Sequence, residues 1–348
     1  MKPELSVVNG VMGTNTAGVD SKPRVAFVEN NTWLVVYSST WVGMNGELGA
    51  DYDIMYAVTE DNGLSWSTPL PLNDYAMTDY EEDYGPTISS DMKEYNSTLV
   101  AMWWSKQPSS TDFDIVWSRS PDSGRTWTPA KLLLPSIFSS DSDTDQTPFV
   151  ETDRKGVWVC VFASYNATIV SGVNTGTDCD VFASYSVDNG LTWSGASLVN
   201  SGGKTDGASA TSNNIDSNPS LATDRKGIWV TVWKCYGGVD TDICSCTALS
   251  ARSRKYAISD SYIRYVAFSS NNGKTWSTSN FVNSYYNGDT LNEGEPSIAG
   301  SAAGVFIVVW RSQDSAMGSS ELSDPEIAVA ISTTNGCTLP PCSLFRRC

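Results

Sequence analysis

Hydrophobic and polar residues alternate along most of the chain in short segments, a pattern typical of β-strands. The strongest segments are five runs rich in β-branched and aromatic residues, at 33–37, 99–103, 157–162, 228–233 and 305–310. Such residues favour pleated, buried strands. Each run follows a short apolar segment led by Pro and a polar turn, and a further strand segment such as 53–58 or 180–185 comes after it. The pattern predicts an all-β chain of antiparallel strands.

An eight-residue motif recurs after the third strand segment of each unit. It reads Ser-Val-Asp-Asn-Gly-Leu-Thr-Trp at 186–193, has close copies at 59–66, 120–127 and 269–276, and has a reduced copy at 332–339. Gly permits a backbone angle that other residues resist, and Asp accepts hydrogen bonds from amides that a tight turn leaves unpaired. The Trp packs as a large apolar group against the neighbouring sheet. The positions that define the motif are Asp61, Gly63, Trp66, Asp122, Gly124, Trp127, Asp188, Gly190, Trp193, Asn271, Gly273 and Trp276.

This motif resembles the Asp-box, or bacterial neuraminidase repeat, of the sialidase (neuraminidase) superfamily. In that family the box joins the third and fourth strands of each propeller blade, on the side away from the active site. The resemblance implies one β-propeller domain over 1–348, built from four-stranded antiparallel blades. Five blades are visible, at roughly 22–74, 85–135, 145–201, 216–284 and 293–345.

The first residues resemble a fourth strand that lacks its own blade, because 5–10 match 197–202. We expect this segment, within 1–21, to complete the blade begun at the C-terminus. That closure gives five blades, where sialidases have six. The alternatives are a six-bladed sialidase-type ring, a piece of a longer chain, or a strand donated to a neighbouring molecule, which would build a polymer.

Charge and composition exclude several classes of function. The net charge is −17, from 39 acidic and 22 basic residues, which argues against nucleic acid and anionic membranes as partners. The apolar run at 305–310 is far too short to span a membrane. The chain has no histidine, so catalytic triads and general bases that need His are excluded, as are most zinc sites.

Cysteines and glycosylation motifs predict a secreted glycoprotein. The chain has eight Cys, and Asn-x-Ser/Thr occurs at Asn30, Asn96 and Asn166. Because 1–18 show no signal-peptide segment, the alternative is a cytosolic chain with free thiols. We expect Cys179, Cys235, Cys244 and Cys246 to form two disulfides in one of three pairings. Cys160 lies in a strong strand and is expected to be a buried thiol. Of Cys337, Cys342 and Cys348, one is expected to be free, paired with Cys160 or linked to another molecule.

The loops before strand one and between strands two and three share the sialidase active-site face, by the same resemblance. These loops are acidic here, and strand three begins with an acidic residue at Asp53, Asp114, Asp180 and Glu326. Clustered carboxylates suit calcium, so these four residues are candidate metal ligands. The alternative is that they cap loop amides.

Sialidases, as the resemblance implies, hold the substrate carboxylate with three arginines, one of them in a Phe/Tyr-Arg-Ile-Pro motif at strand one. The residues two before each strand-one Pro are here Ser21, Tyr84, Gln146, Ser217 and Gly294. Arg264 and Arg311 are the weak candidates for a central pocket. We therefore predict a secreted, sialidase-like propeller that binds a glycan or an extracellular protein, or that self-assembles through its N-terminal strand or C-terminal cysteines. The alternative is a diverged exo-α-sialidase or related glycoside hydrolase.

Overall fold

The computed structural model describes residues 18–41, 48–49, 51–106, 112–136, 142–166, 168–204, 215–236, 262–282, 294–312, 326–333 and 343–345. In this part of the chain, strands form five four-stranded antiparallel sheets, each from four strands consecutive in the sequence. This arrangement confirms the prediction of four-stranded propeller blades. No helix among the described residues has the length and apolarity that crossing a membrane requires.

The first three sheets contain β1 (Asp20–Glu29), β2 (Thr32–Ser39), β3 (Asp53–Thr59) and β4 (Leu70–Pro71); β5 (Asp83–Ser90), β6 (Leu99–Lys106), β7 (Phe113–Ser120) and β8 (Lys131–Leu132); and β9 (Asp145–Thr152), β10 (Trp158–Ser164), β11 (Asp180–Ser186) and β12 (Ser197–Leu198). The other two contain β13 (Ile215–Thr223), β14 (Trp229–Tyr236), β15 (Tyr262–Ser269) and β16 (Asn280–Phe281); and β17 (Ser297–Gly300), β18 (Phe306–Ser312), β19 (Glu326–Ser332) and β20 (Ser343–Phe345).

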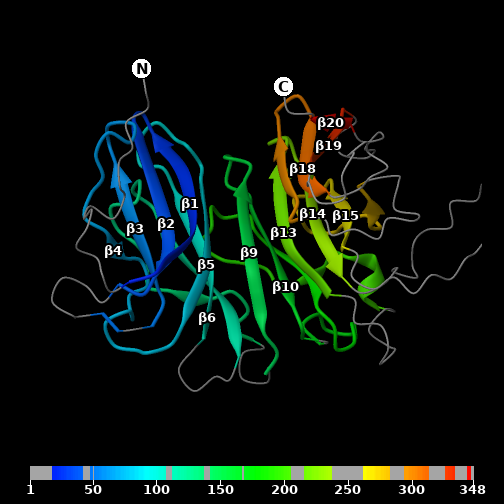
Figure 1. Cartoon of the computed structure of the whole chain (residues 1–348), viewed down its shortest axis with the longest axis horizontal. Coiled ribbons are helices and arrows are strands. Elements are labelled where there is room, and N and C mark those ends of the chain that lie inside the picture. The colour runs from blue at the N-terminus through cyan, green and yellow to red at the C-terminus, as the bar shows by residue number, and fades with distance from the viewer. Residues whose placement is uncertain are drawn as a thin grey trace, which may run out of the picture. The chain divides into compact units, whose positions relative to one another are not determined.

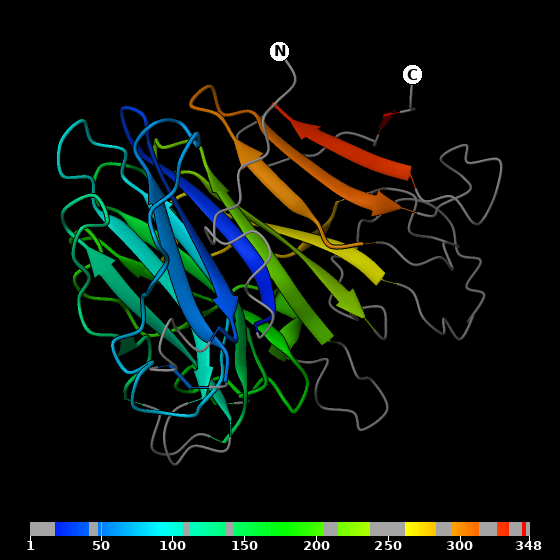
Figure 2. The same ribbon diagram turned by 60° about the vertical axis from the view of Figure 1, so that its left-hand side comes forward.

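The chain forms two compact units, Met1–Cys160 with Ser186–Ser194, and Val161–Tyr185 with Gly195–Cys348. In the first unit β1 lies beside β5, and β5 beside β9 (Figure 1). Buried apolar side chains of its first two sheets, including Leu34 and Trp103, form one core cluster. In the second unit β13 lies beside β17. The strands of its last sheet run side by side, in orange and red in Figure 2. First strands therefore pack against first strands within each unit.

The repeated motif forms the turn between third and fourth strands in the first four sheets, as predicted. At Asp188, the Ser186 hydroxyl donates to Oδ1 (2.7 Å), the Thr192 amide donates to Oδ1 (3.0 Å), and the Thr192 hydroxyl donates to Oδ2 (2.5 Å). Gly190 has φ 77° and donates its amide to the Ser186 hydroxyl (3.0 Å). The carboxylate therefore satisfies the donors that the tight turn leaves unpaired. The reduced copy at 332–339 lies mostly outside the described residues.

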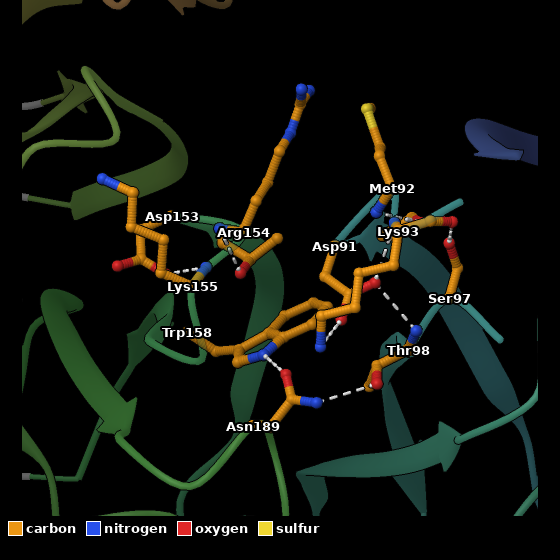
Figure 3. Close-up of polar contacts among 12 residues, drawn as sticks. Asp91, Met92, Lys93, Ser97, Thr98, Asp153, Arg154, Lys155, Trp158 and Asn189 are labelled. Carbon is orange, nitrogen blue, oxygen red and sulfur yellow. Dashed lines mark hydrogen bonds and ion pairs between the residues drawn. The ribbon is translucent and has the colours of Figure 1, made fainter. Parts of the chain in front are cut away.

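Asn189, which precedes Gly190, joins its turn to neighbouring strands by hydrogen bonds (Figure 3). Its Oδ1 accepts from Trp158 Nε1 (3.1 Å), and its Nδ2 donates to Thr98 Oγ1 (2.8 Å). Its carbonyl accepts from Arg119 Nε (2.8 Å). The turns between first and second strands at this end are closed in the same manner, since Asp91 Oδ1 accepts from the Thr98 amide (2.9 Å). This end of the first unit is therefore joined by short, direct hydrogen bonds.

The last sheet differs from the arrangement that the sequence suggested. Its fourth strand is β20, which pairs with β19 from Ile327↔Phe345 to Val329↔Ser343. A segment near the C-terminus, and not the N-terminal segment, therefore fills the fourth-strand position of this blade. The segment at 5–10 lies outside the described residues.

Candidate functional site

The first strand of several blades begins with a β-bulge, and this bulge positions the candidate site. The residue directly before the strand-one Pro has a left-handed φ in four sheets, at Lys22 (53°), Gly85 (57°), Thr147 (51°) and Asn218 (53°). The pairing of strands one and two shifts at the same place in three of them. A bulge of this kind redirects the side chains around it. Strand one thus begins before the Pro, earlier than the apolar pattern indicated.

An acidic residue stands three positions before each of these prolines. The four are Asp20, Asp83, Asp145 and Asp216, and all but Asp20 are buried. Asp83 is 1 % exposed and its Oδ1 accepts from Trp103 Nε1 (3.0 Å). Burial raises its pKa well above the usual range. The constant offset from Pro was visible in the sequence, but the burial of these carboxyl groups was not.

An Asn that follows the fourth strand joins this acid to the first Asp of strand three. Asn73 Nδ2 donates to Asp53 Oδ1 (3.0 Å) and to Asp83 Oδ2 (2.8 Å). The second unit repeats the arrangement, with both distances 2.7 Å, in Asn200, Asp180 and Asp216. One amide group thus bridges two carboxyl groups in each unit. Sequence reasoning missed both asparagines, although each directly follows the apolar residue after its fourth strand.

Of the four predicted metal candidates, only Asp53 belongs to a cluster of three or more possible ligands within the described residues. Its partners are Asp51 and Asp79, and one carboxylate oxygen from each of the three lies within 4.8 Å of the others. Asp114 and Asp180 are buried outside such a cluster, and the side chain of Glu326 lies outside the described residues. Asp53 was thus among the predicted ligands, whereas Asp51 and Asp79 belong to the acidic loops of the same face and were not singled out as ligands.

The carboxyl groups of this cluster have raised pKa values. Burial, followed by the charges of Asp51 and Asp79, raises the pKa of Asp53 to about 7, against the opposing hydrogen bond from Asn73. Burial and the charge of Asp51 raise the pKa of Asp79 to about 6. Burial likewise raises the pKa of Asp51. Like charges and low solvation thus act together here.

A row of aromatic rings lies at the same end of the second blade. Tyr84 stacks on Tyr52 with ring centroids 4.4 Å apart, and lies 5.7 Å from Trp104. Trp104 in turn lies 5.1 Å from Phe113. All four rings are partly exposed. A Cβ on Gly85 would lie 2.5 Å from Trp104 Nε1, so glycine at this bulge allows the row to form.

No protein-family model matches the sequence, and no curated protein is similar enough to count as a relative. Solved structures match its fold. The Hadza microbial sialidase Hz136 is 14% identical, with a TM-score of 0.54 over 93% of this chain and 58% of that chain. The GH93 α-L-arabinofuranosidase of Fusarium graminearum is 14% identical, with a TM-score of 0.55 over 93% and 80%. The leech intramolecular trans-sialidase is 9% identical, with a TM-score of 0.53 over 94% and 60%.

This chain has the sialidase-like propeller fold. At such low identities the similarity shows the fold alone. The chain also spans only 58% of the length of the Hadza sialidase. The extent of a single propeller domain over 1–348 stays a prediction.

In this sialidase-like propeller, the two candidate arginines lie on neighbouring sheets of the second unit. Arg311 is exposed on β18, and its carbonyl accepts from the amide of Gly294 (2.7 Å), which stands two before Pro296. Arg264 lies on β15, and its side chain lies outside the described residues. Ser21, Tyr84 and Ser217 occupy the corresponding positions in other described bulges. None of them can supply a guanidinium group.

The predicted disulfides are not confirmed. Cys160, Cys179 and Cys235 are buried. The cysteines outside the described residues are Cys244, Cys246, Cys337, Cys342 and Cys348.

The glycosylation motifs differ in exposure. Asn30 and Asn96 are exposed and lie in turns with positive φ. Asn166 is 6% exposed, and its Oδ1 accepts from the amide and the hydroxyl of Thr168 (2.9 and 3.1 Å). A buried, hydrogen-bonded amide is a poor site for a bulky glycan, so the structure disfavours the prediction at Asn166.

Proposed function

We propose that this sialidase-like propeller binds neutral glycans through the aromatic row of its second blade and does not cleave sialosides. The observation that carries the proposal is Tyr84. It stands two positions before Pro86, where the resemblance to sialidases places an arginine of the carboxylate clamp, and its ring stacks on Tyr52. An aromatic ring offers the C–H face of a sugar an apolar surface, whereas a guanidinium group binds carboxylate.

The charge around the row favours neutral ligands over acidic ones. The loop before β5 carries Asp79, Glu81 and Glu82, and the chain as a whole has a net charge of −17. A negative field of this kind lowers the rate at which anionic ligands associate. Tyr80, on the same loop, is 84% exposed. The Fusarium enzyme of the same fold was solved with arabinobiose, which is a neutral sugar.

Titration calorimetry against neutral and sialylated oligosaccharides tests the proposal. We expect saturable binding of a neutral glycan, weakened at least tenfold, or about 1.4 kcal/mol, in Trp104→Ala. Tyr95→Ala is the matched control, because Tyr95 is 76% exposed in the turn between β5 and β6 and contributes nothing to the row. Binding that is equally strong in Trp104→Ala, or binding confined to sialylated glycans, would contradict the proposal.

The second candidate is a diverged exo-α-sialidase or related glycoside hydrolase. It is favoured by the repeated acidic residues of the bulges and by the enzymes that share the fold. Fluorogenic sialosides and arabinofuranosides test it directly. Turnover of a sialoside that is lost in Arg311→Ala would replace the binding proposal, and turnover that survives this change would identify a contaminant or a different clamp.

We also infer that the protein works outside the cell and meets its glycan free or on an extracellular protein. The exposed Asn30 and Asn96 support this location. Expression through a secretory pathway, followed by mass determination before and after deglycosylation, tests it. Self-assembly through the N-terminal strand or C-terminal cysteines stays a proposal that the size in solution, with and without reductant, decides.

A further inference from the structure

We propose that Asp51, Asp53 and Asp79 bind a divalent cation, and that this cation is Ca²⁺. The site adjoins the aromatic row, because Tyr52 stands between Asp51 and Asp53, but its ligands are carboxylates and its test needs no sugar.

The first argument is convergence. Asp51 and Asp53 flank Tyr52 at the start of β3, and Asp79 comes from the loop between β4 and β5. Their oxygens nevertheless lie within 4.8 Å of one another. The chain also leaves room for this approach at Gly49, where a Cβ would overlap Asp51 Oδ1 and lie 3.4 Å from the carbonyl of Asp79. Glycine at this position lets the backbone pass beside the carboxylates.

The second argument is that five of the six carboxylate oxygens of the cluster lack a hydrogen-bond donor. Both carboxylate oxygens of Asp51, both of Asp79 and Oδ2 of Asp53 are shielded from solvent and have no hydrogen-bond partner. Asp53 is only 1% exposed, so water does not compensate its Oδ2. Buried carboxylates without donors or a countercharge are costly, and proteins pair them or place them on metals. The nearby Lys106 pairs with Glu81 instead, at 3.1 Å.

The ligand set selects the ion. All candidate donors are carboxylate oxygens, and hard oxygen ligands suit Ca²⁺ and Mg²⁺ over softer metals. Ca²⁺ lies 2.3–2.6 Å from its ligands, so oxygens on opposite sides of it are about 5 Å apart. Oxygens that all lie within 4.8 Å of one another fit this span. Ca²⁺ also accepts irregular ligand geometry, whereas Mg²⁺ demands a near-ideal octahedron and keeps several of its waters. Three carboxylates supply up to six oxygens, which reaches the lower limit of Ca²⁺ coordination.

The third blade provides an internal control. Asp178 and Asp180 stand at the positions of Asp51 and Asp53, eight and six residues before the end of their strand. The residue four before Asp216, however, is Ser212, where Asp79 stands four before Asp83 in the second blade. The third blade therefore lacks the third acid. The second blade has all three in its sequence, at Asp112, Asp114 and Asp141, but Asp141 lies outside the described residues. Among the described residues, the cluster of three is found in the first blade and its following loop.

Calorimetric titration of chelator-treated protein with CaCl₂, and separately with MgCl₂, tests the proposal. We expect saturable Ca²⁺ binding, weaker binding of Mg²⁺, and a rise in the melting temperature as Ca²⁺ is added. Asp51→Asn and Asp79→Asn each weaken Ca²⁺ binding by about tenfold or more, because each removes a charged ligand. Circular dichroism confirms that both variants are folded.

Two matched variants locate the effect. Asp74→Asn removes an exposed charge from the same loop, and Asp178→Asn removes the corresponding carboxylate of the third blade. Both keep wild-type Ca²⁺ affinity if the site is as proposed. Absence of saturable Ca²⁺ binding by the wild type, or equal affinity in Asp79→Asn, overturns the proposal. Neither result bears on glycan binding, which is measured separately with Trp104→Ala.

Discussion

The two ends of strand β3 carry the same side chain in opposite environments. Two residues beyond its C-terminal end, Asp61 Oδ1 accepts from the Thr59 hydroxyl (2.7 Å) and the Ser65 amide (2.9 Å), and Oδ2 accepts from the Ser65 hydroxyl (2.6 Å). These donors, with the Ser65 hydroxyl as the largest cause, lower the pKa of Asp61 to about 2. The turn therefore stabilises its carboxylate as an anion.

At the other end of the strand, three carboxylates lie together, and five of their six oxygens lack a donor; the sixth, Asp53 Oδ1, accepts from Asn73 Nδ2 (3.0 Å). The pKa of Asp53 is raised to about 7, and that of Asp79 to about 6, chiefly by burial. The difference shows that the repeated turn supplies hydrogen-bond donors to its carboxylate from its own residues. The bulged end does not supply enough donors for its carboxylates. The repeated end of the blade thus serves the fold, and the end that varies between blades is where we propose that ligands bind.

The largest effect is expected from breaking the close packing of the turn end. Gly124 has φ 86°, and a Cβ there would lie 2.6 Å from Leu34 Cδ1, in the core between the first two blades. Gly124→Ala therefore combines a strained backbone with overpacking, and we expect a loss of about 2 to 4 kcal/mol in the free energy of unfolding. Urea denaturation measures it.

Gly172→Ala separates the two causes. Gly172 has a similar φ of 79°, but a Cβ there would meet nothing within 4 Å. We expect this control to lose only about 1 kcal/mol, since backbone strain alone remains. Equal losses in both variants would show that packing against Leu34 contributes nothing.

The same contrast explains what the sequence could predict. The strands and their turns follow from local patterns, such as the β-branched run of β18 and the Asp188 motif, so they were predictable. Asp79 joined its cluster from a loop without periodicity, and Tyr84 met Trp104 only through the bulged register of β5 and β6. Contacts made by tertiary placement leave no local pattern. The offset of Asp83 from Pro86 was a signal, but only alignment of the repeats on their prolines reveals it.

A single type of substitution should have opposite effects at the two ends. In the presence of chelator, Asp79→Asn removes repulsion among three carboxylates, and we expect a gain of about 1 kcal/mol in the free energy of unfolding. Asp122→Asn at a turn removes an anion that the Ser120 hydroxyl (2.9 Å) and the Thr126 amide (2.8 Å) stabilise. We expect it to lose less than about 1 kcal/mol.

The fourth blade shows why the second loss is small. Asn271 occupies the Asp position of its turn, where its Oδ1 accepts from the Thr275 amide (3.0 Å) and its Nδ2 donates to the Thr275 hydroxyl (2.7 Å). An amide therefore closes the turn nearly as well as a carboxylate. If thermal denaturation in chelator showed the same sign for Asp79→Asn and Asp122→Asn, the contrast between the two ends would fail.

The smallest expected effect is on the pH dependence of stability below pH 4. The pKa of Asp188 is lowered to about 2 because the hydrogen bonds from Thr192 and Ser186 outweigh the opposing effect of burial. A carboxyl group with a lowered pKa in the folded state contributes stability above its unfolded pKa, near 4, and loses it as the pH falls to about 2. Below pH 4 the unfolded chain binds the proton first, so acid favours unfolding. We expect Asp188→Asn to flatten the fall in stability between pH 4 and pH 2.

The converse substitution makes the test specific, because other carboxyl groups also titrate in this range. Asn271→Asp introduces a carboxylate among the donors of Ser269 and Thr275, so the fall in stability between pH 4 and pH 2 should become steeper. Urea denaturation at several pH values measures both slopes. Asp188→Asn and Asn271→Asp change the net charge in opposite directions at equivalent turns. If the turn donors cause the pH dependence, the slope of stability against pH becomes shallower than wild type in Asp188→Asn and steeper in Asn271→Asp. Slopes that both stay at the wild-type value would mean that the turn donors do not distinguish a carboxylate from an amide.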